Sequence, residues 1–472
     1  MPPAGADWRG KQLALLASQL HQRQSCALYA DLIASAEAEL EPDAPAASRR
    51  NLELLRLQLE RQQRLDPSLV SNIAVAQARG NAVWQESRKA DDFNMFAPAL
   101  QELVGLRQEQ ARQLAEPRSS WESLAQPFEP DITKARLNEL FTPLKQRLPQ
   151  LLSEASSLLG PTPSADASLS KFDQERLGAE LLDSWGYEPE HCQRGHSAHP
   201  FSCTLGPSDF RITTRVVPGE PFSAFLATAH EWGHSLYEQG LPRIGEHYFP
   251  WPLGDATSMG VHESQSLFWE CRVARSEAFA RRWFPRFQAV QTNSPWSGAS
   301  GFWRALNPMQ ASLIRVEADE LSYCLHIVLR FELELALIEG DMPIADLPEQ
   351  WNQHMQKLLG LRPPSDRDGC LQDIHWAEGM FGYFPSYALG HLISAQLCEA
   401  MEQDLGPIEG LIASGDEQCL HSWLAQHVYP LGRSVNCAEL VERVSGAPLS
   451  AHPFLRYMEN KLIRLGTLTT TA

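Results

Sequence analysis

Apolar side chains in the first third of the chain recur at three-and-four spacing, and this periodicity limits the fold more than any other feature. Between Trp8 and Leu159 it runs through segments such as NLELLRLQLERQQR and FAPALQELVGLRQEQARQLA, rich in Leu, Ala, Gln, Glu and Arg. Residues at this spacing share one face of an α-helix. The region therefore predicts successive helices, separated by segments such as EPDAPAAS and FEPD.

The segment at residues 196–217 has a different pattern. It reads HSAHPFSCTLGPSDFRITTRVV, with Phe, Thr, Ile and Val around a GPSD turn, which is typical of a β-hairpin. Helical periodicity returns after it. We expect a mainly α-helical protein in which residues 1–472 form a single domain: a helical N-terminal part at 1–160, the hairpin, and a second helical part at 218–472.

Composition argues against several classes of function. The 472 residues include 40 Lys and Arg against 58 Asp and Glu, a formal net charge of −18. Such a surface repels phosphate backbones and anionic lipids, so nucleic acid and membranes are not expected partners. No apolar stretch reaches the roughly 20 residues that span a bilayer, and the first residues lack a secretory signal. We expect a soluble cytoplasmic protein whose nine Cys are reduced thiols.

The segment HEWGH carries the strongest chemical signal. An early proline and a late glycine flank an apolar stripe around it, which predicts a buried helix. Residues four apart differ by about 40° around an α-helix, so His230 and His234 can bind one cation from the same side. Glu231 lies about 100° further round the helix, where it can act as a general base towards activated water. The alternative is a pair of core histidines bonded to the backbone.

A catalytic zinc site usually takes three protein ligands, so a third must be found. In the downstream segment GVHESQSLFWE, Glu263 would enter the first turn of another helix, and we favour it. The adjacent His262 competes for this role. Glu238 and Glu246 are further carboxylates near the first helix, although Glu238 would point past the cation. Spacing alone favours Glu263 over His262 without deciding between them.

Peptide-bond hydrolysis at such a site would need additional hydrogen-bonding groups. In DIHWAEGMFGYFPSY, His375 and Tyr383 are candidates to face the oxygen of a tetrahedral intermediate, with Tyr387 in reserve. Aromatic packing in the core is the alternative for each. A free carboxylate of a substrate could be bound by the planar guanidinium of Arg211 or Arg315.

Two further patterns lie near these candidates. Arg315 begins a polar line, continued by Asp319, Tyr323 and His326, on what we expect to be an apolar helix. A solvated helix face is the alternative. Glu270 follows Glu263 by two helical turns and could hydrogen-bond a histidine ligand.

Six segments occur in an order that resembles the carboxypeptidase Taq family of metallocarboxypeptidases. They are HPF from His199, DFRITT from Asp209, HEWGH, VHESQ, IRVEAD from Ile314, and GCLQDIHW from Gly369, the last followed by FGYFP. The resemblance extends over almost the whole chain.

The resemblance implies a largely helical peptidase domain with a deep active-site groove, and a small sheet beside the metal site. It implies one divalent metal ion per chain, zinc or alternatively cobalt, with Glu263 as the third ligand beside His230 and His234. The implied activity is removal of single residues from peptide C-termini, with broad specificity. A homodimer is the common assembly of the family.

Overall fold

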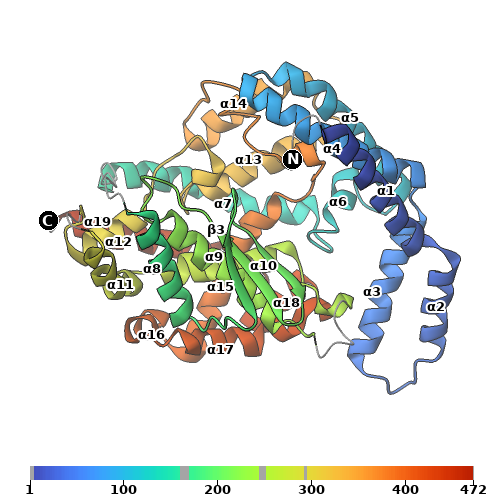
Figure 1. Cartoon of the computed structure of the whole chain (residues 1–472). Helices are drawn as coiled ribbons and strands as arrows, with labels where there is room; N and C mark the ends of the chain where they lie inside the picture. The colour runs from blue at the N-terminus through green and yellow to red at the C-terminus, as the bar shows by residue number, and fades with distance from the viewer. Residues whose placement is uncertain (1–4, 160–168, 244–250, 292–294, 471–472) are drawn as a thin grey trace. The chain divides into compact units, whose positions relative to one another are not determined.

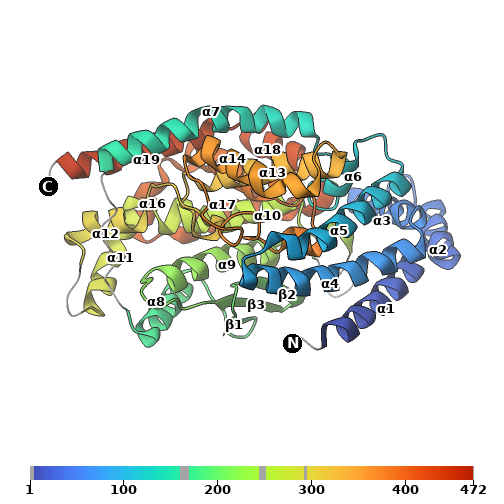
Figure 2. The ribbon, with the colours of Figure 1, turned by 90° about the horizontal axis from the view of Figure 1, so that it is seen from above.

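The structure, a computed structural model, is mainly α-helical with one small sheet (Figure 1, Figure 2). It describes residues 5–159, 169–243, 251–291 and 295–470. The predicted fold class is therefore confirmed. Contacts between residues group the chain into two compact units. Unit 1 consists of Met1–Glu139, Ala311–Ala318 and Leu325–Pro385, and unit 2 of Leu140–Gln310, Asp319–Cys324 and Ser386–Ala472.

The N-terminal helices that the apolar periodicity predicts lie in unit 1. They are α1 (Ala6–Ser25), α2 (Ala27–Ala38), α3 (Ala46–Gln63), α4 (Pro67–Ala90), α5 (Phe93–Leu114), α6 (Ser120–Ala125) and the beginning of α7 (Lys134–Leu159). Helix α4 packs against both α1 and α5. The carboxylates of Asp66 and Asp92 begin α4 and α5, because each accepts a backbone N–H of the first turn.

The later segments of unit 1 contribute most of α13 (Tyr323–Glu339), α14 (Leu347–Leu359) and three 3-10 turns, Arg315–Glu317, Ile344–Asp346 and His375–Glu378. Glu334 of α13 is fully buried. Its Oε1 accepts the indole N–H of Trp121 at 3.0 Å and the backbone N–H of Gly382 at 3.1 Å, and its Oε2 accepts the indole N–H of Trp376 at 3.2 Å. One carboxyl group therefore connects α13 with α6 and with the segment after α14.

The prediction that one helix carries the polar line starting at Arg315 was wrong. Arg315 lies in a 3-10 turn, and α13 begins only at Tyr323. Asp319 explains the late start, because its Oδ1 accepts the backbone N–H of Ser322 at 2.7 Å and its carbonyl accepts that of Tyr323 at 2.9 Å. An Asp at this position satisfies the first N–H groups of a helix instead of continuing one.

Unit 2 contains the sheet, with strands β1 (Cys192–His196), β2 (Ser202–Gly206) and β3 (Asp209–Thr214) in the order β1-β3-β2. Strands β2 and β3 form the predicted antiparallel hairpin, with Ser202 paired to Ile212. Strand β1 pairs in parallel with β3, with Cys192 opposite Phe210, and was not predicted. Phe210 and Ile212 are buried on one face of β3, which packs against α9 (Ser223–Gly240).

Helix α9 is the helix that the apolar stripe around HEWGH predicted, and unit 2 contains further helices. They are the remainder of α7, α8 (Lys171–Ser184), α10 (Met259–Leu267), α11 (Glu277–Ala289), α12 (Gly298–Leu306), α15 (Pro385–Leu405), α16 (Ile408–Ser414), α17 (Glu417–His427), α18 (Cys437–Ser445) and α19 (His452–Thr470). A π-helix, Phe268–Ala274, continues α10, and 3-10 turns lie at Pro252–Gly254 and Tyr429–Ser434. Helices α8 and α10 pack directly on α9.

Two further findings concern membrane-spanning helices and disulfide bonds. Within the described ranges, no helix combines the length and the apolar character that crossing a bilayer requires. The nine Cys all lie in those ranges, and none forms a disulfide.

The buried carboxyl of Glu334 predicts a specific pH dependence of stability. Burial raises its pKa to about 8, although the three N–H donors oppose the rise, and the ordinary value is 4.5. Between these values the folded protein retains a proton that the unfolded chain releases, so raising the pH favours unfolding. We expect the wild type to lose stability relative to Glu334→Gln by up to about 1.4 kcal/mol per pH unit over this window.

The measurement is urea-induced unfolding of both proteins between pH 4.5 and 8, followed by tryptophan fluorescence. Glu334→Gln has no titrating group at this position, so the difference between the two proteins isolates Glu334 from all other groups. A difference in stability that is constant with pH, or that grows in favour of the wild type, contradicts the assignment.

Candidate metal centre

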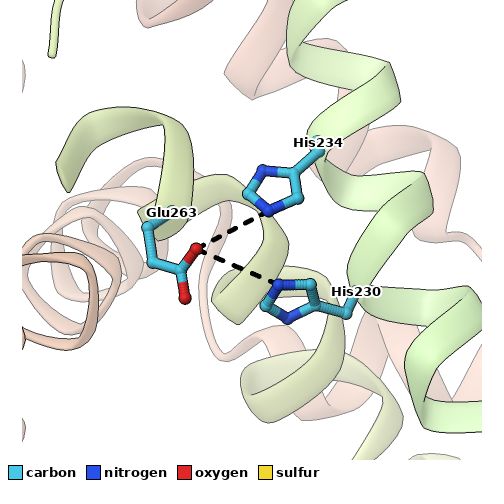
Figure 3. A group of neighbouring side chains, drawn as sticks. All are labelled: His230, His234 and Glu263. Carbon is cyan, nitrogen blue, oxygen red and sulfur yellow. Dashed lines mark ion pairs between the residues drawn. The ribbon is translucent and has the colours of Figure 1, made fainter. Parts of the chain in front are cut away.

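The two histidines of HEWGH lie one turn apart on α9 and face Glu263 (Figure 3). The Nε2 atoms of His230 and His234 are 3.9 Å and 3.6 Å from Oε2 of Glu263. Glu263 is the fifth residue of α10, one position beyond the first turn in which we expected it. All three donor atoms lie within 4.8 Å of one another.

Two glycines allow this convergence. A Cβ added at Gly233, inside HEWGH, would lie 2.7 Å from both the carbonyl oxygen of Gln265 and the Cα of Ser266, so α9 and α10 meet backbone to backbone. A Cβ added at Gly390 of α15 would lie 2.6 Å from Cγ of Glu263. Such distances are closer than non-bonded carbon atoms can approach. Glycine at these positions therefore lets Glu263 reach the two imidazoles.

Hydrogen bonds at the other ring nitrogens fix which atom each histidine presents. His230 Nδ1 is 3.0 Å from Oε2 of Glu270, and His234 Nδ1 is 3.1 Å from the backbone carbonyl of His262. Both partners accept hydrogen bonds, so each Nδ1 carries a proton and each Nε2 is the ring atom that faces Glu263. A metal ion that binds there would replace any proton on Nε2. The predicted hydrogen bond between Glu270 and a histidine of HEWGH, here donated by His230 Nδ1, is confirmed.

The charges around the site favour a cation. Burial alone would lower the pKa of His230, but Glu270, Glu263 and Glu231 together raise it to about 10. Burial raises the pKa of Glu231 to about 7. Burial would also raise that of Glu270, yet Arg275 and His230 bring it down to about 2. Three carboxyl groups thus create a negative field at His230.

The donor set suits a divalent transition metal ion. Two neutral imidazole nitrogens and one carboxylate oxygen are the ligands of many catalytic zinc sites, which keep a further position for water or substrate. The three side chains of this group are all partly shielded from solvent. The residues present therefore fit a bound metal ion.

The competing candidates for a third ligand point elsewhere. His262 Nε2 is 3.0 Å from Oε1 of Glu238, and its ring stacks on His234 with centroids 4.4 Å apart. Glu238 also pairs with Arg243 at 2.7 Å, so it lies past the group as expected. Glu246 lies outside the described residues.

Among the described residues, one further group has the composition of a metal site: Cys271, Glu320 and His391, all buried. Glu320 is 2.7 Å from Nζ of Lys461 and 3.3 Å from Nη1 of Arg272. Two cations beside one carboxylate repel a third cation. We assign no metal ion to this group.

The predicted residues of unit 1 are held by internal contacts. Arg315 is buried and donates from Nε and Nη2 to Oδ1 of Asp373, at 2.9 Å and 2.7 Å. The ring of His375 lies 5.6 Å from that of Tyr383, which packs edge-to-face on Phe128. Burial lowers the pKa of His375 to about 4, and its imidazole is therefore neutral at pH 7.

The two remaining candidates lie in unit 2. Arg211 is exposed on β3, and its Nε and Nη2 both donate to the carboxylate of Asp209 at 2.7 Å. Tyr387, near the start of α15, is half-buried, with its ring 6.2 Å from that of Tyr323.

Sequence reasoning missed Arg275, which donates from Nε and Nη2 to Oε1 of Glu270 at 3.1 Å and 2.9 Å. The two residues are five apart, a spacing that places side chains on different faces of an α-helix. No pattern in the sequence therefore indicated this pair.

Comparisons with known proteins agree on one family. The sequence model of the Carboxypeptidase Taq (M32) metallopeptidases matches residues 1–462. Thermostable carboxypeptidase 1 of Thermus thermophilus is 38% identical over 98% of this chain and 93% of its own length, and carboxypeptidase 1 of Bacillus subtilis is 32% identical over 98% and 92%. The crystal structure of an M32 carboxypeptidase from Deinococcus radiodurans superposes with a TM-score of 0.91 at 33% identity, covering 99% of this chain and 94% of that one.

The close approach of α9 and α10 predicts the effect of Gly233→Ala. The new Cβ would meet backbone atoms of α10, so the helices must separate and carry Glu263 away from the histidines. We expect a loss of about 1–3 kcal/mol in stability together with weaker metal binding. Thermal unfolding and titration of the metal-free protein with Zn²⁺ measure the two effects.

Gly410→Ala in α16 is the matched control, because a Cβ there meets nothing within 4 Å. Alanine in a helix should leave this variant unchanged or up to about 1 kcal/mol more stable. If Gly233→Ala matched Gly410→Ala in both stability and metal affinity, the proposed role of the close approach would be wrong.

Proposed function

The chain belongs to the carboxypeptidase Taq (M32) family of metallopeptidases. We propose that it binds one divalent metal ion, preferably zinc, and uses it to release single C-terminal residues from peptides. We assign His230, His234 and Glu263 as the ligands. The observation that carries this assignment is the convergence of two Nε2 atoms and one carboxylate oxygen within 4.8 Å.

Glu231 is the proposed general base. A divalent ion bound at such a site supplies Lewis-acid polarisation of the scissile carbonyl and of water. Glu231 follows His230 on α9 and is buried, so its carboxyl is shielded from bulk water. It accepts a proton from the attacking water and passes that proton to the departing amine nitrogen. This sequence needs no covalent intermediate with the protein.

Charge develops on the carbonyl oxygen during the attack, and we propose that His375 and Tyr383 donate hydrogen bonds to it. The low pKa of His375 supports this role, because a neutral imidazole carries one N–H and adds no charge to the site. Arg211, Arg315 and Tyr387 are the proposed contacts for the substrate and its terminal carboxylate. A guanidinium can donate two parallel hydrogen bonds to a carboxylate.

Several broader properties accompany this proposal. Because one family model extends over residues 1–462, we propose that the two units act as one peptidase domain. Broad specificity for the C-terminal residue, assembly as a homodimer and a cytoplasmic location stay predictions from the sequence.

Replacing the base should separate catalysis from metal binding. Glu231→Gln retains the three ligands and removes the proton acceptor, so we expect bound metal at the wild-type level and a rate at least about 100-fold lower. His234→Ala removes a ligand and should lose both metal and activity. Elemental analysis of the purified variants, with release of the C-terminal residue from a blocked dipeptide, measures both properties.

Full activity of Glu231→Gln would exclude Glu231 as the base. Metal content in His234→Ala equal to that of the wild type would exclude the proposed ligand set. A wild-type protein that is inactivated by a chelator and reactivated by Zn²⁺ or Co²⁺ provides the reference for both variants.

Recognition of a free carboxylate predicts strict dependence on the peptide terminus. A peptide and its C-terminally amidated counterpart differ only in that charge, so we expect residues to be released from the first and not from the second. Mass spectrometry of the products distinguishes the possibilities. Internal cleavage of either peptide would instead indicate an endopeptidase.

A further inference from the structure

The segment that follows Glu263 has an unusual backbone. Helix α10 ends at Leu267, and Phe268–Ala274 continues it as a π-helix. The backbone N–H of Arg275 donates to the carbonyl of Glu270, five residues earlier, at 3.0 Å. π-Helical turns are rare and occur frequently at functional sites.

This backbone brings Glu270 and Arg275 together. In an α-helix, residues five apart point about 140° away from each other. The wider π-helical turn, with its i→i+5 bonds, places them on the same side. Nε and Nη2 of Arg275 can then both donate to Oε1 of Glu270, while Oε2 remains available to His230 Nδ1 at 3.0 Å.

Arg275 is itself fixed by the end of α12. Its Nη1 donates to the carbonyl of Leu306. Its own carbonyl accepts the indole N–H of Trp303 at 3.0 Å and the side-chain amide of Asn307 at 3.1 Å. These contacts therefore fix both the guanidinium and the backbone of Arg275.

From this geometry we propose that Arg275 is a positioning residue of the metal centre: it holds the Glu270 carboxylate, which in turn fixes the ring of His230 with Nε2 towards the metal. The inference rests on the proposed ligand set. Without Arg275, a buried carboxylate would lose its main cationic partner and could rotate away from His230. Partners of this kind commonly change metal affinity by 10- to 100-fold.

A cavity gives experimental access to Arg275. It has a volume of about 270 Å³ and lies within unit 2. Its lining includes Arg275, Trp303, Cys398, Arg456, Tyr457 and Arg464. Removing the side chain of Arg275 would enlarge this cavity up to Glu270, so a small guanidinium compound could enter and replace the missing group.

The test compares the Co²⁺ affinity and visible absorption spectrum of four metal-free proteins reconstituted with Co²⁺. These are the wild type, Arg275→Ala, Arg275→Lys and the control Arg456→Ala. Arg456 lines the same cavity but pairs with Glu399, and its side chain is 56% exposed. We expect about 10- to 100-fold weaker binding and an altered spectrum in Arg275→Ala. Arg275→Lys should recover part of the affinity, and Arg456→Ala should match the wild type.

Addition of methylguanidinium should restore Co²⁺ affinity to Arg275→Ala and have no effect on Glu270→Ala, which lacks the carboxylate that the compound must hold. If Arg275→Ala fails to fold, Arg275→Lys alone decides the question, because a single ammonium cannot form both hydrogen bonds. Wild-type affinity and spectrum in a folded Arg275 variant would overturn the inference. A wild type that binds no Co²⁺ would instead overturn the proposed metal site.

Discussion

The backbone contact between α9 and α10 is the constraint on which the site depends. Two helices with ordinary side chains at their crossing lie about 8–10 Å apart. Gly233 removes the side chain at this crossing, and Gly390 removes another that would occupy the space of Glu263. The side chain of Glu263 on one helix can then reach the two histidines on the other, and all three residues lie on helices. Donors on packed helices are held more rigidly than donors on loops.

Rigid placement has an electrostatic cost. Glu231, Glu263 and Glu270 are held close together in a poorly solvated place, where like charges repel strongly. Arg275 offsets the charge of Glu270 through an ion pair, and all three carboxyl groups raise the pKa of His230. A bound cation would relieve the remaining repulsion. Folding of unit 2 thus gathers carboxyl groups around the place where the proposed cation binds.

The sequence predicted the parts of this arrangement that follow regular periodicity. The N-terminal helices, the β2-β3 hairpin and the α9 range all carried patterns of period 3.6 or 2. Strand β1 was missed because CQRGH has no alternation of apolar residues, and its position depends on pairing with β3. The start of α13 was misplaced because Asp319 uses its side chain on the backbone. Arg275 was missed because its contact requires a π-helix, whose i→i+5 spacing matches neither pattern.

The division of the chain between the two units affects how it folds during synthesis. The chain passes from one unit to the other five times, at residues 139, 310, 318, 324 and 385. Domains usually fold as their residues leave the ribosome, beginning with the N-terminal one. Here α4 and α5 emerge early, but Glu334 and Trp376, which complete the core around Trp121, emerge only after α9 and α10. The apolar faces of the N-terminal helices that pack on these later segments therefore stay exposed while the helices of the metal site are synthesised.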